Sequence, residues 1–523
     1  MDAFLISLLE HYQMTLEDLR SRKLPGSFQN LAAPDGDDKF ELVIQRLRQA
    51  SEKKEKTVIY GDYDVDGLTS TCILKRALDE LGLNPGYFIP SRYREGYGIV
   101  KERVHDFKKK GYQLIITVDN GITANEAVSE AIALGMDVVI IDHHELPSVL
   151  PETPYIFHQL LSRFIPYNCS AASLCFFVAN RLLGRMDEYL ATLAGIAVFS
   201  DVMPLVGNNL ELAKLSLSFL KKYQYRNLLS LILNKSDEIS YDDLSFQVIP
   251  ALNSPGRIES DVMATNKACA LLIQKDDPDR IRLLSTYILS VNEKRKKLVK
   301  ETKIQDDGLF ESSHSFSAKE DGPSGLCGLV ANRLLREKKK CILILSADEC
   351  NHDRLVGSIR APAGYDFTQF LKKKKKYFIA SGGHPQACGI TILKKDYFQV
   401  VLLFSTEAER QALFVKEGRD ESIPISLADL NGRNYQTLQS FLPFGEGHPS
   451  PRFEITVDKK DVLLSASGRA SFVYNKDRTA KITYFGIPDV LKDREGTITF
   501  LGDFRKEVFQ GKVSYVLLSN VSK

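Results

Sequence analysis

The sequence is poor in the features that mark secreted, zinc-binding and membrane-spanning proteins. Its eight cysteines are scattered over 523 residues and form no Cys-x-x-Cys pair, which argues against a disulfide framework and structural zinc and suits a reducing cytoplasm. No apolar run approaches the length of a membrane span, and the first residues, MDAFLISLLEHYQ, carry charges too early for a signal peptide. There is also no internal repeat and no long low-complexity segment. We therefore expect a cytoplasmic globular protein of two to four domains.

A strong excess of one charge is absent as well, since the formal net charge is only +2. This balance neither demands nor excludes a nucleic-acid partner. Basic residues nevertheless gather at 53–56, 108–110, 294–303, 336–340 and 372–376. Each run alone is most simply a solvated helix face, but beside a catalytic site the runs together would form a surface that follows a phosphate backbone.

What the sequence does contain, between residues 57 and 141, is an alternation of apolar strands and amphipathic helices. TVIYGDYD at 57–64, LIITVDNG at 114–121 and DVVIIDHH at 137–144 each begin as a short apolar strand. Because these strands are continuously apolar and alternate with helices, they predict an α/β domain with a parallel sheet covered on both faces.

The rest of the chain predicts further domains. Residues 261–305 have the pattern of a long helix with a break near Pro278, which could bridge two domains. A second α/β unit follows the loop at 306–325, and the short strands after about residue 425 occur at the spacing of a small β-barrel of the OB-fold type. The expected division is a helical segment at 1–50, a catalytic domain at 51–260, a connecting helix at 261–305, a second α/β domain at 306–424 and a barrel at 425–523.

The three predicted strands all end in groups that bind metals or protons. In an open parallel sheet the carboxyl ends of the strands share one edge, so these groups should converge. Neighbouring carboxylates repel one another unless cations lie between them, and oxygen-rich sites with one or two imidazoles suit Mn²⁺ or Mg²⁺ better than zinc. A shared carboxylate can hold two ions about 3.5–4 Å apart for phosphoester hydrolysis. The residues concerned are Asp62, Asp64, Asp66, Asp119, Asp142, His143 and His144.

Each of these elements alone has a simpler explanation. An aspartate at a strand end, such as Asp119, is usually a turn or helix cap, and paired histidines can belong to a surface turn. Asp201, which precedes Pro204, is a weak candidate by itself. Gly67 and Gly121 favour a binding site, because glycine lets the backbone turn tightly beside a ligand.

Four motifs, in this order, resemble those of the DHH phosphoesterase family: GDYDVDG at 61–67, TVDNGI at 117–122, DHHE at 142–145 and SDVMPL at 200–205. The later stretches PSRYREGYG, LNSPGR, VGSIRA, SGGHPQACG and PFGEGHPSPRF resemble the RecJ group of that family, and SGGHPQACG resembles the signature of its DHHA1 domain. The resemblance covers about residues 40–523. It implies a DHH catalytic domain, a DHHA1 domain joined to it by a long helix, and a C-terminal OB-fold.

The resemblance also implies roles for individual residues. Asp119 would bridge two ions, and a water activated by them would attack phosphorus. Asp62, Asp142 and His144 would belong to the catalytic surroundings, with His144 at the scissile phosphate and Asp142 orienting the histidines. The implied metal ligands are Asp64, Asp66, Asp119, His143 and Asp201, and the implied substrate-binding residues are Arg257, Ser358, Arg360, Gly382, Gly383 and His384. An interdomain salt bridge is the simpler explanation of Arg257.

The activity implied is a 5′→3′ exonuclease that degrades single-stranded DNA to 5′-mononucleotides with two Mn²⁺ or Mg²⁺ ions. Its setting would be DNA repair and recombination, as a monomer assisted by single-strand-binding protein and a helicase. The residues by themselves support only a two-metal phosphoesterase. A phosphodiesterase of cyclic dinucleotides or short oligonucleotides and a non-catalytic DNA-binding scaffold remain as alternatives.

Departures from the family pattern concern substrate contacts rather than metal ligands. CSAASLCFF at 169–177 replaces a glycine-rich run, and DGPSGLCG at 321–328 lacks a usual histidine. In the expected barrel, Tyr474, Phe485 and Phe509 are aromatic residues that could stack on bases, although each is more often a core residue.

Overall fold

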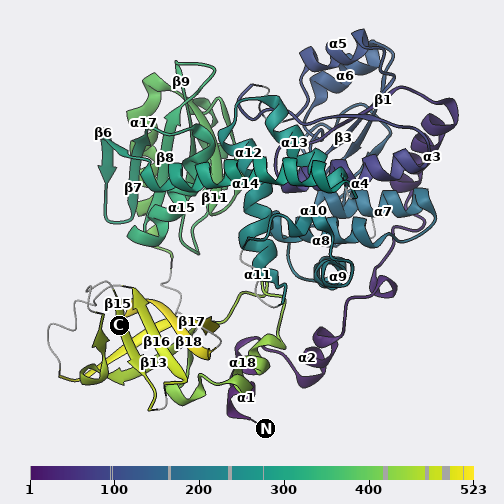
Figure 1. Ribbon diagram of the computed structural model, residues 1–523. Helices are drawn as coiled ribbons and strands as arrows, with labels where there is room; N and C mark the ends of the chain where they lie inside the picture. Colours follow the sequence, from purple (N-terminus) through teal and green to yellow (C-terminus); the bar gives the residue numbers. More distant parts are fainter. Residues whose placement is uncertain are drawn as a thin grey trace. The chain divides into compact units, whose positions relative to one another are not determined.

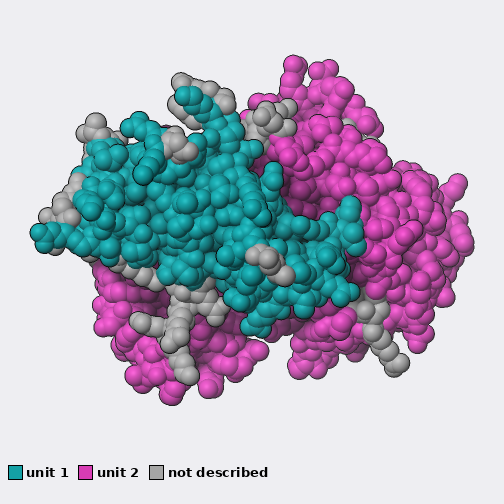
Figure 2. All heavy atoms as spheres, turned by 90° about the horizontal axis from the view of Figure 1, so that it is seen from below, with its two compact units in different colours: residues 1–25, 419–523 teal, residues 26–418 magenta. Residues whose placement is uncertain are grey.

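The computed structural model describes residues 2–522, apart from short gaps. The chain forms two compact units. One unit is made of residues 26–418, and the other combines residues 1–25 with residues 419–523 (Figure 2). Among the described residues, no helix is long and apolar enough to cross a membrane. The gaps are 95, 97, 163–165, 234–237, 275, 416–421, 466–469, 477, 486–494 and 510–511; of 262, 305–308, 485, 509 and 520–522 only the backbone is described.

The first sheet of the larger unit is parallel throughout and has the strand order β2-β1-β3-β4-β5. The residues of β1 and β3 are completely buried, as expected for strands covered on both faces. This confirms the predicted parallel α/β sheet, to which the structure adds the short strands β2 and β5. The strands are β1 (Thr57–Tyr60), β2 (Gly86–Phe88), β3 (Leu114–Val118), β4 (Asp137–Ile141) and β5 (Ile156–Phe157).

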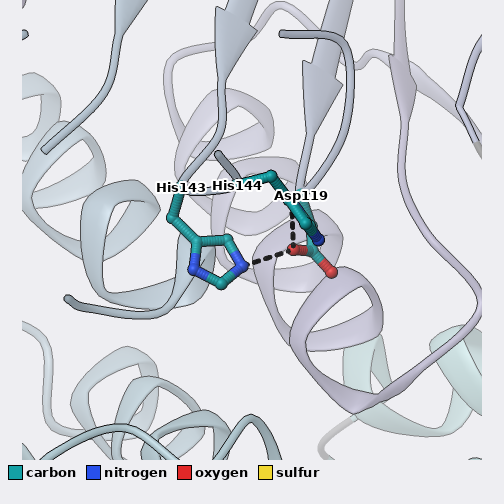
Figure 3. A group of neighbouring side chains, drawn as sticks. All are labelled: Asp119, His143 and His144. Atoms are coloured by element: carbon teal, nitrogen blue, oxygen red, sulfur yellow. Dashed lines mark hydrogen bonds and ion pairs between the residues drawn. The ribbon is translucent and has the colours of Figure 1, made fainter. Parts of the chain in front are cut away.

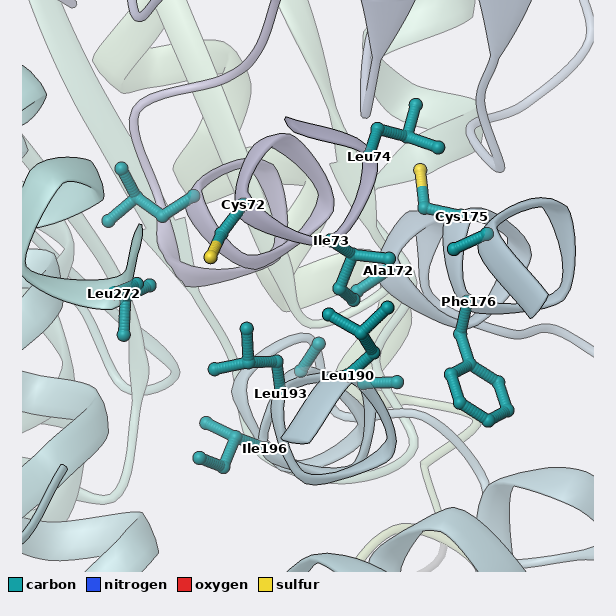
Figure 4. Close-up of a cluster of buried hydrophobic side chains, with 14 of the residues drawn as sticks. Cys72, Ile73, Leu74, Ala172, Cys175, Phe176, Leu190, Leu193, Ile196 and Leu272 are labelled. Carbon is teal, nitrogen blue, oxygen red and sulfur yellow. The ribbon is translucent and has the colours of Figure 1, made fainter. Parts of the chain in front are cut away.

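Helices pack against both faces of this sheet (Figure 1). Alternate strand residues enter two separate cores, so that Ile116 and Val139 belong to the larger core whereas Ile115 and Val138 belong to the smaller one. Figure 4 shows part of the larger core, in which side chains of α4, α7 and α8 interlock. The larger core contains α3 (Asp38–Lys53), α4 (Val65–Glu80), α7 (Ala171–Leu183), α8 (Glu188–Ser200) and α9 (Gly207–Tyr223); the smaller contains α5 (Lys101–Lys109) and α6 (Asn125–Ala133).

The region predicted as a long helix with a break near Pro278 forms two helices, α13 (Val262–Ile273) and α14 (Pro278–Glu301), so the break is confirmed. Pro278 occupies the first turn of α14, where its missing N–H costs nothing. Ile288 of α14 belongs to the core of the first sheet, whereas Val291 belongs to a core of the second. One helix thus contributes to both cores. The shorter elements before α13 are α10 (Arg226–Leu229), α11 (Tyr241–Asp243), a π-helical turn at Leu244–Val248 and α12 (Ile249–Ile258).

The second sheet has the order β10-β11-β9-β8-β7-β6 and is mixed, since β7 and β8 are parallel and the other pairs antiparallel. Its two faces belong to different cores, one with α15 and the other with α17. The elements are β6 (Ile304–Glu311), β7 (Ser315–Glu320), α15 (Cys327–Lys338), β8 (Cys341–Ala347), β9 (Arg354–Arg360), α16 (Thr368–Lys373), β10 (Ala380–His384), β11 (Ala387–Leu393) and α17 (Tyr397–Ala412).

The smaller unit is built on a seven-stranded sheet with the order β12-β13-β17-β18-β16-β15-β14. The short strands predicted after about residue 425 are present in this sheet. The pairings of the described residues leave β12 and β14 as edges, so the closed OB barrel stays a prediction. The elements are β12 (Ile423–Pro424), α18 (Gly432–Gln439), β13 (Phe453–Asp458), β14 (Leu463–Leu464), β15 (Ala470–Tyr474), β16 (Ala480–Phe485), β17 (Thr497–Phe509) and β18 (Lys512–Ser522).

Two N-terminal helices, α1 (Ala3–His11) and α2 (Leu16–Lys23), complete the core of this smaller unit. Phe4 is 5% exposed, and its ring stacks on that of Phe453 at 5.7 Å between centroids. Residues 1–25 therefore belong with the C-terminal sheet, and only residues 26–50 belong with the first sheet. This differs from the expectation that residues 1–50 frame the first domain, because helical periodicity shows that a helix has an apolar face but not which distant segment covers it.

Candidate metal centre and phosphate-binding surface

The acidic ends of β1, β3 and β4 converge, as predicted. Among the described residues, three groups of side chains each place one potential ligand atom per residue within 4.8 Å of the others. Asp119 belongs to two of these groups, which suits a carboxylate shared between ions. Asp142 belongs to none of them. The groups are Asp62–Asp64–Asp119, Asp66–His143–Asp201 and Asp119–His143–His144.

His143 lies at the middle of this centre. Its Nε2 atom is 3.1 Å from Asp119 Oδ1, 3.3 Å from Asp201 Oδ2 and 3.6 Å from Asp66 Oδ2. Figure 3 shows the ring directed at Asp119. Burial lowers the pKa of His143 to about 3, so the ring is neutral near pH 7. A neutral imidazole is the form that ligates metals.

The carboxylates of the centre are buried and repel one another. Burial, followed by the charge of Asp64, raises the pKa of Asp66 to about 7, and burial raises the pKa values of Asp62, Asp119 and Asp201 well above the usual range. Asp62 Oδ1 is also buried and has no hydrogen-bond partner among the described residues. Such a set of oxygens is stabilised in its ionised form by hard divalent cations, so the donor set fits Mg²⁺ or Mn²⁺.

Helix termini hold three of these acids in place. Asp64 is the N-cap of α4, where its Oδ1 accepts a hydrogen bond from Gly67 N at 3.2 Å. Asp66 accepts hydrogen bonds from Ala171 N at 2.7 Å and Ala172 N at 2.8 Å, the first residues of α7. The start of CSAASLCFF therefore supplies backbone donors for Asp66, in a run of small residues that permits the close approach. Asp201 is the C-cap of α8.

The backbone conformation of Asp119 sets the direction of its side chain. Asp119 has φ +61°, in the left-handed region that aspartate tolerates better than most residues. Gly121 has φ +109°, and a Cβ there would lie 2.3 Å from Thr117 Oγ1. The sequence predicts that Gly67 allows a tight turn beside a ligand, but it lies within helix α4. A Cβ at this position would lie 2.5 Å from the backbone of Asp62. The role of Gly67 is close packing of α4 on the β1 strand end.

Asp142 is fully buried and orients the histidine pair rather than joining the metal groups. Its Oδ1 accepts hydrogen bonds from His143 N at 2.7 Å and His144 N at 3.2 Å, and lies 2.7 Å from His144 Nδ1. Although burial lowers the pKa of His144, the hydrogen bond and charge of Asp142 raise it to about 9. His144 is therefore protonated near pH 7, and its side chain is 40% exposed.

Four partly buried arginines from different segments lie close together near these acids. Burial, followed by the charge of Arg92, lowers the pKa of Arg257 to about 10, and Arg295 and Arg360 act in the same direction. Arg92 lies over the ring of Tyr63 at 4.3 Å, and no residue in the described part of the chain forms a hydrogen bond with its buried Nε atom. No ion pair of Arg257 occurs among the described residues, contrary to a simple salt bridge. Clustered guanidinium groups of this kind suit an anionic ligand.

The sequence predicts Arg257 and Arg360 as substrate-binding residues but neither Arg92 nor Arg295. Arg92 lies within PSRYREGYG and Arg295 within the basic run 294–303, and neither pattern identifies the individual arginine. Only the packing of α14 and of the segment after β2 shows that these two guanidinium groups approach the others.

The predicted substrate-binding residues of the second sheet lie on β9 and β10. Ser358 and Arg360 approach the first turn of α15, where a Cβ on Gly328 would lie 2.7 Å from Arg360 Nη2. Gly382, Gly383 and His384 belong to β10, which is exposed along its length. Gly383 has φ +127°, and a Cβ on Gly382 would meet no atom within 4 Å. Arg360 thus belongs to the arginine cluster. The strand β10 is instead solvent-exposed, and its glycines leave its backbone accessible.

The strand ends of this parallel α/β sheet carry carboxylates and histidines that could hold metal ions, which defines an α/β protein with a candidate metal centre. Residues 56–198 of the chain match the model of the DHH family, N-terminal domain.

Two curated relatives and one solved structure extend this comparison. The single-stranded-DNA-specific exonuclease RecJ of Bacillus subtilis (strain 168) is 30% identical over 436 residues, which are 79% of this chain and 54% of that protein. RecJ of Salmonella typhimurium is 27% identical over 455 residues, 79% of this chain and 77% of that protein. The structure of RecJ with Mn²⁺ from Thermus thermophilus covers 99% of this chain and 76% of its own, with TM-score 0.79 and 21% identity. The chain spans about half the length of the Bacillus subtilis relative.

Proposed function

We propose that this protein is a 5′→3′ exonuclease that degrades single-stranded DNA to 5′-mononucleotides, acting in the cytoplasm in DNA repair and recombination. The observation that carries the proposal is a buried centre of carboxylates and His143 lying beside a cluster of arginines that form no ion pair within the described residues. The first feature suits hydrolysis of a phosphodiester, and the second suits its charged backbone. The relatives described as single-stranded-DNA-specific exonucleases support the same reaction.

The proposed cofactors are two Mn²⁺ or Mg²⁺ ions. Asp119 would be shared between them, since among the described residues it is the one carboxylate that belongs to two of the three ligand groups. Such ions, when bound, supply Lewis acidity that makes water a better nucleophile and offsets negative charge at phosphorus. The proposed ligands are Asp64, Asp66, Asp119, His143 and Asp201.

The protein's own side chains complete the proposed site. His144, protonated through its hydrogen bond with Asp142, would donate to the scissile phosphate and offset its charge. Asp142 holds the ring in that orientation, and Asp62 adds negative charge beside Asp64. The non-bridging oxygens of the substrate would be bound by Arg92, Arg257, Arg295 and Arg360, with Ser358, Gly382, Gly383 and His384 holding the strand against the second sheet.

Several surface features fit a long single strand. Lys372 forms an exposed ion pair with Glu145 at 3.7 Å, which places the lysine run of α16 near the segment that follows His144. In the smaller unit Tyr474 is 37% exposed and lies near Phe472, so it is available for stacking on bases; the side chains of Phe485 and Phe509 lie outside the described residues. We further propose a monomer that works with single-strand-binding protein and a helicase.

The proposal is tested with a single strand labelled at either end, in the presence of Mn²⁺. Release of mononucleotides from the 5′ end, with no attack on a blunt duplex and no activity in Asp119→Asn, is the expected result. Release from the 3′ end would overturn the polarity. Rapid turnover of a cyclic dinucleotide with no action on a long strand would favour the small-nucleotide alternative, and binding of the strand without turnover would favour the scaffold.

A further inference from the structure

All four backbone polar groups of the dipeptide His143–His144 are bound by buried side chains. Both N–H groups donate to Asp142 Oδ1, at 2.7 and 3.2 Å. The carbonyl oxygen of His143 accepts a hydrogen bond from Gln159 Nε2 at 2.7 Å, and that of His144 accepts one from His158 Nε2 at 2.8 Å. His158 is 0% exposed and Gln159 is 1% exposed. No rotation of this peptide segment is possible without breaking at least one of these bonds.

The sheet register explains why these two residues reach the histidines. β5 pairs in parallel with β4, with Ile141 opposite Phe157. His158 and Gln159 therefore leave β5 beside the point at which Asp142 and His143 leave β4. The tautomer of His158 is also determined: Leu160 N donates to its Nδ1 at 3.1 Å, so in the neutral ring Nε2 carries the proton that is donated to His144.

We infer that His158 and Gln159 are positioning residues of the metal centre, which set the direction of His143 and His144 through their carbonyl groups. His143 Nε2 meets three carboxylates within 3.6 Å, so a small rotation of its backbone would move the nitrogen out of register with them. Neither positioning side chain is exposed, so they act on the substrate only through the histidines. The inference rests on the proposed function for the statement that the centre binds metal.

If His158 and Gln159 only stabilised the fold, their replacement would lower the melting temperature without changing metal binding. Removing a donor to a buried carbonyl costs stability wherever it occurs. Thr153 provides the matched case, because its Oγ1 donates to the carbonyl of Val138, at the opposite end of β4, at 2.6 Å. Thr153→Val should lower the melting temperature and leave metal binding unchanged.

The test is direct titration of the full-length protein with Mn²⁺, without DNA, by the electron paramagnetic resonance signal of free Mn²⁺. Gln159→Met keeps the volume but removes the donor, and we expect it to weaken Mn²⁺ binding about tenfold or more, as loss of supporting hydrogen bonds around a metal typically does. His158→Gln keeps a donor at the position of Nε2 and should bind Mn²⁺ within about twofold of the wild type, because the supporting bond is retained.

The outcomes separate this inference from the proposed function. If Gln159→Met binds Mn²⁺ like the wild type and only melts earlier, as Thr153→Val should, the inference is overturned even if the wild type degrades single strands. If the wild type binds Mn²⁺, Gln159→Met binds it more weakly, His158→Gln binds it like the wild type and no strand is degraded, then the inference stands and the proposed function fails. Absence of Mn²⁺ binding by the wild type would overturn both.

Discussion

Asp119 Oδ1 and His143 Nε2 lie 3.1 Å apart, although the two residues follow different strands of the first sheet. Neither group has the protonation state that a simple ion pair requires, because burial lowers the pKa of His143 to about 3 and raises that of Asp119. A neutral imidazole beside clustered carboxylates is arranged for a shared cation rather than for mutual neutralisation.

Replacement of Asp119 tests this arrangement. Asn also tolerates the left-handed backbone at φ +61°, so Asp119→Asn should fold. We expect its exonuclease rate to fall by at least about a hundredfold through loss of a shared ligand. Its melting temperature in a chelator should equal or exceed that of the wild type, because the variant lacks a buried carboxylate whose ionised form is disfavoured by burial and by the neighbouring acids. A variant that melts earlier and loses activity in proportion would contradict this explanation.

Chelation should stop activity without unfolding the protein. The larger and smaller units have their own hydrophobic cores, and carboxylates left without cations can take up protons, as the raised pKa of Asp66 indicates. We expect EDTA to abolish strand degradation while a cooperative melting transition remains in calorimetry. Collapse of that transition in EDTA would show that the metals are structural.

Arg257 should contribute to substrate binding and little to stability. Since burial and neighbouring arginines disfavour its charge, Arg257→Gln should leave the melting temperature unchanged or raise it. Binding of single-stranded DNA should weaken, and the slope of log K against log salt should become shallower by about one unit or less per lost phosphate contact. Arg336→Gln, which removes an exposed arginine of α15, is the control. Equal effects of both variants would mean that only overall charge matters.

The N-terminal helix should be necessary for the stability of the smaller unit. Phe4 is buried against Phe453 and Phe504, so Phe4→Ala should destabilise this unit by about 3–5 kcal/mol. Ile6→Ala changes a residue of the same helix that is 38% exposed and should have a much smaller effect. Calorimetry should show the loss in one transition only, that of the unit containing residues 419–523. An equal loss in the larger unit would contradict the observed division.

The smaller unit should also lose stability in mild acid. Burial, followed by the charge of Arg22, lowers the pKa of His448 from 6.5 to about 4. The unfolded chain therefore takes up this proton first, so the contribution of His448 is complete above pH 6.5 and is lost as the pH falls towards 4. The melting temperature of this unit should fall between pH 7 and pH 5 more steeply in the wild type than in His448→Gln. Parallel curves would show that other groups dominate.

Much of the centre was predictable because it depends on local pattern and on one rule of topology. Continuous apolar strands such as β3 indicate a buried parallel sheet, and parallel strands bring their carboxyl ends to one edge. The sequence alone therefore predicts that the strand-end residues converge, namely Asp62, Asp64, Asp66, Asp119 and the two histidines. Asp142 binds the backbone of both histidines and belongs to none of the ligand groups found among the described residues, and its supporting role stays a prediction.

The remainder required tertiary structure, because it depends on contacts between segments far apart in sequence. Phe4 meets Phe453, and Arg92 approaches Arg257, yet no periodicity in either segment identifies its partner. His158 and Gln159 follow a strand of only two residues, β5, too short to produce a recognisable pattern. The sequence by itself thus determined the sheet and the residues at its carboxyl edge, since these follow from the hydrophobic pattern of neighbouring strands. Only the packing of distant segments decided which arginines cluster beside the acids, which residues hold the histidines and which unit the N-terminal helices complete. The physical reason is that an apolar or charged face in the sequence shows that some other segment will pack on it, but does not identify that segment.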